Sequence, residues 1–314
     1  MIKNIVRKLL LGVSLAGIVT FTAAASACSI QTAHPKARIT VEFNSETYEL
    51  DYTLYRNMYP NTVRHFIELA DSGYYNDMLV HNYGTQDWYT GGYSYDADKF
   101  ATALSTENFA QYLEDVSKES SYMQLFADGK LTSTVYSTLT LNDKGEDVAQ
   151  GALPTLIGEF KLNGHEVDPA ASALKAEYGT LKMYYYNKPV GGKVVMTPTT
   201  DQVIGNVDYK YNCATSIFAM QVDSSSGNVG ADNFAVFARI ANASDLDELI
   251  ADVDEYLTDT YGDSLTSHQT YGASVTVDNL VEVFSDAAAD SGIDQTFRVT
   301  KTPIIIRSVK ITKY

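Results

Sequence analysis

The chain has 314 residues and a formal net charge of −16, from 39 acidic and 23 basic side chains. This length allows one domain with insertions, or two domains, and in either case a sizeable core. The acidic balance argues against a nucleic acid as a partner, because phosphate binding needs clustered lysine and arginine.

The first 27 residues have the layout of a secretory signal. Three basic side chains precede an apolar run from Leu9 to about Ala25, and small residues follow it. The run is too short, and wrongly flanked, to favour a permanent membrane span. We therefore expect residues 1–27 to be removed, which changes the net charge from −16 to −19 because three positive charges leave.

Cys28 would be the first mature residue, and two interpretations of it stay open. A cysteine at this place resembles the bacterial lipobox, although Ala25 stands where that motif usually has leucine. Lipidation, which we favour, would anchor the exported protein to a membrane, at the cell surface or on the periplasmic side. The rival interpretation is a disulfide with Cys213, the only other cysteine, which an oxidising exterior would allow.

The mature chain begins with a tether and two predicted strands. Residues 28–37 show no apolar period. In residues 38–43 and 48–54 every second side chain is apolar or aromatic, and a turn at 44–46 separates the two segments. This alternation is typical of half-buried strands, so we expect an opening hairpin.

A helix is predicted next, from Pro60 to the stop signal at Gly73. Asn61 or Thr62 can cap its first turn, and four apolar residues follow at helical spacing: Val63, Phe66, Ile67 and Ala70. After the glycine, a strand-like segment leads through His81 to the glycine pair at 91–92.

Residues 96–153 differ in character from the flanking sequence. We expect a helix over 109–116, capped by Ser105 or Thr106, and a strand over 131–141. Further elements are predicted downstream: strands at 215–221, 233–240 and 303–311, a helix that Ser244 caps, and a helix candidate at 277–289. Short strands, two main helices and no strand-helix-strand rhythm predict a closed or sandwich-like β architecture capped by helices.

Residues 60–83, PNTVRHFIELADSGYYNDMLVHNY, closely resemble a segment of the cyclophilin-type peptidyl-prolyl cis-trans isomerases. Further segments are similar to that family in the same order: the glycine pair 91–92, IGEFKLNG at 157–164, YGTLKM at 178–183, TSIFAM at 215–220, NFAVFARI at 233–240 and IIIRSVKI at 304–311. The resemblance covers most of residues 38–95, 154–257 and 300–312.

The resemblance implies a mainly β fold, a closed eight-stranded barrel with a helix over each end. Here residues 38–314 would form this domain, with an inserted α+β element at about 96–153 and a second, smaller insertion at about 258–298. It also implies a groove on one outer face that binds proline-containing peptides or exported unfolded chains. We expect no cofactor and no metal, since the five histidines and two cysteines lack zinc-site spacing.

Catalysis in this family needs an apolar pocket for the proline ring and an arginine that donates a hydrogen bond to the amide nitrogen as the bond twists. The family arginine follows the histidine, but here Asn82 follows His81. Counting on from His81 places Thr90 at the groove glutamine, Trp88 at a methionine and Asp87 at the pocket phenylalanine. A register shift of one residue would instead place Trp88 at the phenylalanine.

The other groove positions are also altered. Tyr184 and Tyr186 stand where small alanines form the floor, Phe218 falls at a core phenylalanine and Ala219 at the aromatic position that stacks on proline. Phe234 takes the place of a histidine or tyrosine, and Tyr89 completes the candidate groove.

Structural interpretations stand beside these functional ones. His81 fits a packed histidine, Trp88 and Tyr89 fit ordinary packing as well as a peptide platform, and at most two of the tyrosines at 184–186 can face a groove. The framework thus matches the family better than the groove does. We expect a weak isomerase that assists the folding of exported proteins, or a catalytically silent module that binds peptide or another ligand. The oligomeric state stays open.

Overall fold

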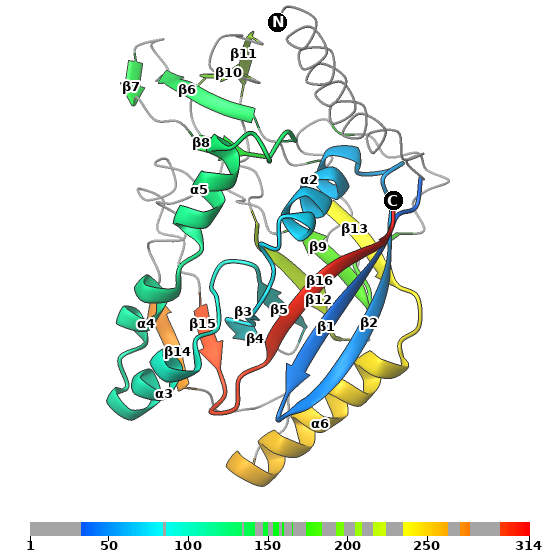
Figure 1. Cartoon of the computed structure of the whole chain (residues 1–314), viewed down its shortest axis with the longest axis vertical. Coiled ribbons are helices and arrows are strands. Elements are labelled where there is room, and N and C mark those ends of the chain that lie inside the picture. Colours follow the sequence, from blue (N-terminus) through cyan, green and yellow to red (C-terminus); the bar gives the residue numbers. More distant parts are fainter. Residues whose placement is uncertain are drawn as a thin grey trace, which may run out of the picture. The chain divides into compact units, whose positions relative to one another are not determined.

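The computed structural model describes the following residues: 33–83, 86–133, 135–141, 147–149, 153–156, 159, 165, 174–183, 193–197, 205–208, 216–223, 235–262, 271–276 and 296–314 (Figure 1). The predictions for the leader, the tether up to residue 32, Cys28, Cys213 and the helix candidate at 277–289 lie outside these residues. No helix in the described part of the chain is both long and apolar enough to cross a membrane.

The predicted opening hairpin is confirmed. Strand β1 (Lys36–Phe43) pairs antiparallel with β2 (Glu46–Leu54), with Phe43 opposite Glu46. The two residues between them, Asn44 and Ser45, have φ values of 49° and 69°. Two consecutive left-handed residues form the type I′ turn, whose twist matches that of the flanking strands.

Helix α2 (Pro60–Asp71) begins with proline in its first turn, as predicted, but its cap differs from the prediction. Neither Asn61 nor Thr62 caps it with a side chain. Instead the buried carboxylate of Glu159 accepts the backbone N–H of Asn61 at 3.0 Å and that of Thr62 at 2.8 Å. A negative charge at this end is stabilised by the helix dipole, so a distant residue supplies the cap.

Among the described residues, eight strands curl around one core. This count takes β3 (Met78–Leu79) and β4 (Asn82–Tyr83) as one interrupted strand. The order runs through β5 (Asp87–Thr90), β12 (Phe218–Gln221), β9 (Thr180–Met183), β13 (Ala235–Ile240), β2, β1 and β16 (Ile305–Lys313) to β3. Because β3 pairs with β16 while β4 pairs with β5, the path closes on itself. This confirms the predicted mainly β barrel.

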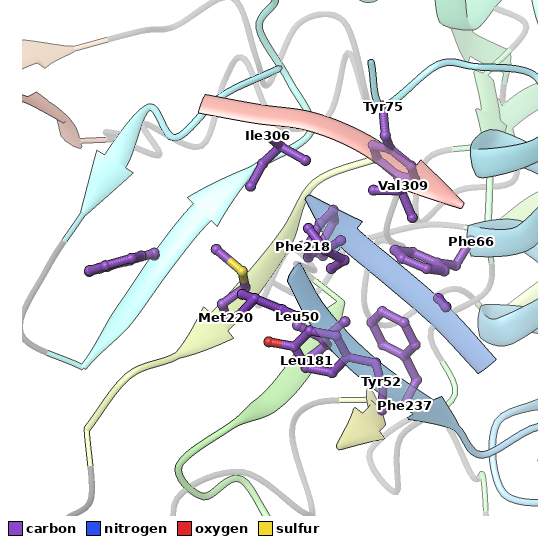
Figure 2. Packing of buried hydrophobic residues seen from close by; sticks show 14 of the residues in the cluster. Leu50, Tyr52, Phe66, Tyr75, Leu181, Phe218, Met220, Phe237, Ile306 and Val309 are labelled. Atoms are coloured by element: carbon purple, nitrogen blue, oxygen red, sulfur yellow. The ribbon is translucent and has the colours of Figure 1, made fainter. Parts of the chain in front are cut away.

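The barrel interior is apolar and aromatic. Figure 2 shows Phe66 from α2 directed toward Phe218 and Phe237, and its ring centroid lies 5.4 Å and 5.1 Å from theirs. Helix α6 (Ser244–Tyr261) buries one apolar stripe in the same core: Leu246, Leu249, Val253 and Leu257. The two predicted covering helices are therefore present, although Ser244 is the first residue of α6 and makes no cap hydrogen bond.

Three short helices follow the glycine pair: α3 (Ala97–Thr106), α4 (Phe109–Val116) and α5 (Glu119–Ala127). The predicted cap at Ser105 or Thr106 was wrong, because both residues belong to α3 and Asn108 caps α4 by accepting the N–H of Gln111. Apolar residues of α3 and α4 pack on the barrel wall in a cluster with Leu79, Tyr93 and Ile217.

A second antiparallel sheet has five strands in the described residues: β6 (Val135–Leu141), β7 (Asp147–Ala149), β8 (Leu153–Thr155), β10 (Lys193–Thr197) and β11 (Gly205–Asp208). The strand predicted over 131–141 thus begins at Val135. Two further strands, β14 (Tyr271–Thr276) and β15 (Thr296–Val299), pair with each other, and β15 lies parallel to β4 (Figure 1).

Candidate functional site

One row of residues crosses five neighbouring strands on the outer face of the barrel. Register partners link these residues in order: Arg298 on β15, Asn82 on β4, Tyr89 on β5, Ala219 on β12 and Lys182 on β9. We call these five residues the outer row. Residues in register on adjacent strands project from the same face of a sheet.

The adjacent row fixes which face this is. Its members belong to the barrel core: Tyr83, Trp88, Met220 and Leu181. Because successive side chains of a strand point to opposite faces, the outer row lies on the outside of the wall. This is the face on which the family resemblance places a peptide groove.

The structure places Asn82 and Tyr89 in the outer row, both half-buried, with Ala219 only 2 % exposed beside them. His81 is 1 % exposed, and its ring packs edge-on against Tyr93 at 5.1 Å. Its backbone N–H donates to the carbonyl of Tyr89, so it joins β4 to β5. This placement agrees with the interpretation of His81 as a packed histidine.

Three predicted groove residues lie inside the wall instead. Trp88, Thr90 and Phe218 each have 0 % exposed surface. The hydroxyl of Thr90 donates to the carbonyl of Leu79 at 2.9 Å, and Phe218 packs in the core as its family position suggests. Trp88 is a core residue, so the packing interpretation fits it and its ring offers no platform on the outer face. Side chains of one strand alternate between the two faces, and only the pairing register decides which face Trp88 takes.

A buried ion pair includes Asp87, the residue that counting from His81 places at the family's pocket phenylalanine. The Lys182 ammonium lies 2.7 Å from the carboxylate of Asp87, and their side chains are 8 % and 16 % exposed. The two residues sit on β9 and β5, with β12 between them. The small methyl group of Ala219 leaves room for the lysine to reach across β12. Sequence reasoning missed Lys182, although a lysine between the apolar residues Leu181 and Met183 is a signal for a buried partner.

Arg298 also escaped the sequence analysis. Its backbone N–H donates to the carbonyl of His81 at 2.8 Å, which brings β15 alongside β4. Parallel pairing between such distant segments leaves no local pattern in the sequence, so periodicity could not reveal it.

The glycine pair after β5 has a structural reason. Gly91 has φ of 99°, and a Cβ on it would lie 2.3 Å from the carbonyl oxygen of Ser216. The hydroxyls of Tyr74 and Tyr75 donate to the side chain and carbonyl of the same serine, at 2.9 Å and 3.0 Å. This network holds the end of β5 close to the start of β12 and so fixes the outer row.

The remaining predicted site residues, Tyr184, Tyr186, Phe234 and Cys28, lie outside the described residues. Within the part of the chain that the structure describes, no group of histidine, cysteine or acidic side chains is arranged to hold a metal ion.

Comparisons with known proteins agree with the resemblance noted in the sequence. Residues 38–193 match the family model described as cyclophilin type peptidyl-prolyl cis-trans isomerase/CLD. This range includes three members of the outer row: Asn82, Tyr89 and Lys182. No curated protein sequence matches the chain.

Among solved structures, the chain is similar to a cyclophilin type peptidyl-prolyl cis-trans isomerase of Cryptosporidium parvum, with 11 % identity and a TM-score of 0.35 over 90 % of this chain and 99 % of that one. The structure of the same isomerase in the presence of the dipeptide Ala-Pro has 11 % identity to this chain and a TM-score of 0.35, over 89 % of this chain and 99 % of that one. The Mimivirus cyclophilin has 12 % identity and a TM-score of 0.34, over 72 % of this chain and 82 % of that one.

Proposed function

Because this chain belongs to the cyclophilin-type peptidyl-prolyl cis-trans isomerase family, we propose that it is a low-activity isomerase that acts on prolyl bonds of exported, incompletely folded proteins. The rotation it would catalyse has a barrier of about 18–20 kcal/mol and takes tens to hundreds of seconds unaided. A catalyst lowers this barrier only by interactions that strengthen as the amide twists.

We expect low activity because of the residue at the donor position, Asn82. Twisting leaves a lone pair on the imide nitrogen, and a hydrogen bond to that lone pair favours the twisted state. Asn82 stands where the family has arginine, half-buried on the outer face. Its amide is shorter than a guanidinium and uncharged. Loss of one preorganised donor typically lowers a rate by about 10² to 10³.

The residues at the pocket positions also support low activity. A proline ring is apolar and gains free energy by contact with an apolar wall. Here the wall contains the Lys182–Asp87 ion pair, and Ala219 stands at the position where the resemblance implies a stacking aromatic ring. Contact between a proline ring and a paired charge would cost desolvation without a compensating hydrogen bond. We therefore expect weaker peptide binding as well as a slower rate.

The cellular part of the proposal rests on the leader. A charged start, an apolar run and small residues before Cys28 support export, and the lipobox-like position supports a lipid anchor. Substrates would then be chains that have crossed the membrane. The mass of the mature N-terminus tests this point, because a diacylglycerol on Cys28 adds a large increment that neither cleavage alone nor a disulfide produces.

A second candidate function is a catalytically silent module that binds a peptide or another ligand on the same face. The ion pair favours it, because paired charges suit a polar ligand better than a proline ring. This module would bind peptide in a titration yet leave its cis-trans exchange unchanged.

The deciding experiment measures isomerisation of a proline tetrapeptide by the mature protein, together with peptide binding followed by NMR shifts. We expect acceleration over buffer, at a rate about 10² to 10³ below that of a family member that carries the arginine. Tyr89→Ala should lower the rate, and Lys310→Gln, an exposed change on β16, should not. Binding without acceleration would select the silent module, and a rate typical of the family would contradict low activity.

A further inference from the structure

Arg298 and Asn82 lie side by side in the outer row, although they are far apart in the sequence. They are register partners in the parallel pairing of β15 with β4, and the Arg298 N–H donates to the carbonyl next to Asn82. Neighbouring strands are about 4.8 Å apart, and register partners share a face. The arginine side chain therefore leaves the sheet next to the position where the family has its own arginine.

Among the described residues, the guanidinium of Arg298 has no carboxylate partner. Four other arginines in the described residues each pair with a carboxylate: Arg38, Arg64, Arg239 and Arg307. Arg298 makes no ion pair with any described residue, and it is half-buried. A guanidinium stays charged under all ordinary conditions and holds five N–H groups. Such a group on the outer face is suited to meet an electron pair on a bound ligand.

We propose that Arg298 is the catalytic donor of this protein, reaching over Asn82 to hydrogen-bond the imide nitrogen of a bound prolyl peptide as its amide twists. The inference rests on the proposed isomerase function and names the group that supplies its residual rate. No bond to the substrate forms or breaks. The guanidinium acts because the nitrogen lone pair accepts a hydrogen bond in the twisted state and is delocalised in the planar one.

This assignment also explains why a neutral residue stands at position 82. Two arginines directly opposite each other on neighbouring strands would repel, which destabilises a sheet pair. Asparagine leaves space and adds no charge. The donor, however, starts from a strand about 4.8 Å away from the usual one, so its alignment with the imide is poorer and the rate lower.

The test compares the isomerisation kinetics of the mature protein with those of Arg298→Gln and of an exchange variant, Asn82→Arg with Arg298→Asn. We expect Arg298→Gln to lower kcat by about 10² with little change in KM, because the contact forms mainly in the transition state. The exchange variant places one guanidinium on the outer face again, on β4 in place of β15. It should therefore recover the isomerisation rate of the wild type. Lys310→Gln, which removes a positive charge from exposed β16, serves as the control and should match the wild type.

Each outcome decides the proposal. Wild-type acceleration that survives Arg298→Gln would overturn the donor role and leave the proposed isomerase function intact. Absence of acceleration in the wild type would overturn both. If Arg298→Gln loses the rate and the exchange variant, folded by circular dichroism and binding peptide, fails to recover it, Arg298 supports the structure and does not donate to the imide.

Discussion

The ammonium of Lys182 lies 2.7 Å from the carboxylate of Asp87, on strands that have β12 between them. Both side chains are largely buried, at 8 % and 16 % exposure. Removing charges from water costs several kcal/mol per ion, and mutual attraction offsets this cost only while both partners are present. We therefore expect the ion pair to affect both the stability of the barrel wall and the kind of ligand that the outer face can bind.

Breaking this pair from one side should be more harmful than removing both charges. We expect Lys182→Met or Asp87→Leu alone to lower the free energy of unfolding by about 3–5 kcal/mol, because each leaves a buried charge without its partner. The double variant should lose much less. Urea unfolding of the three variants forms a double-mutant cycle. Additive losses would mean that the two charges do not stabilise each other.

Ala219→Phe should strengthen the binding of a proline peptide only when the ion pair is absent. In the wild type the new ring competes with the lysine that crosses β12, and overpacking of this kind costs about 1–3 kcal/mol. In the Lys182→Met, Asp87→Leu background the ring gains an apolar neighbourhood. There we expect tighter binding of a proline tetrapeptide, measured by calorimetry, than in the same background with Ala219. Equal affinities would show that the pair does not limit the pocket.

Gly91→Ala should be markedly destabilising, whereas Gly129→Ala should cost less. Both glycines have positive φ, 99° and 70°, so alanine is strained at either position. A Cβ at Gly91 would also lie 2.3 Å from the Ser216 carbonyl oxygen, while one at Gly129 meets nothing within 4 Å. We expect a loss of about 1–2 kcal/mol at Gly129 and a larger loss at Gly91, from thermal unfolding. Equal losses would mean that β5 and β12 can separate at no cost.

The ion pair of Glu42 with Arg307 should make part of the stability depend on pH. The Arg307 guanidinium donates to Glu42 at 2.8 Å, and this hydrogen bond holds the pKa of Glu42 below its ordinary value of 4.5. A carboxyl whose pKa is lower in the folded state stabilises the fold above its unfolded pKa and loses this effect as pH falls through the folded pKa. We expect a contribution of about 0.2–1 kcal/mol, since both side chains are about a third exposed.

The matching measurement compares the stability of wild type and Glu42→Gln between neutral pH and about pH 3. The difference between the two proteins should be largest at neutral pH and shrink on acidification. A difference that stays constant with pH would show that Glu42 acts through packing and that its charge has no part.

Local periodicity predicted the framework well. Alternating side chains located the β1–β2 hairpin, and the 3.6-residue spacing located α2 and α6, because both patterns depend on neighbours within one element. The family resemblance then supplied the barrel. Element starts were predicted less accurately. Glu159 caps α2 in place of Asn61 or Thr62, and Asn108 caps α4 in place of Ser105 or Thr106. Helix α6 has no side-chain cap hydrogen bond, although Ser244 was predicted to cap it.

The outer row was harder to predict because it depends on contacts across the chain. Trp88 was assigned to the groove, but its strand turns that ring into the core, and only the pairing register decides which face it takes. Lys182 and Asp87 lie on separate strands, and Arg298 on a third, so their proximity exists only in the folded wall. The identity of Asn82 is visible in the sequence, whereas its neighbour on a distant strand is not.

The seam between β1 and β16 has a consequence for biogenesis. These strands lie near opposite ends of the chain and pair from Lys36 with Lys313 to Glu42 with Ile305. The wall thus cannot close on a nascent polypeptide until its last strand has been synthesised. Contacts of such long sequence separation fold slowly. A chain that lacks β16 would leave β1 and β3 without the strand that pairs with both of them.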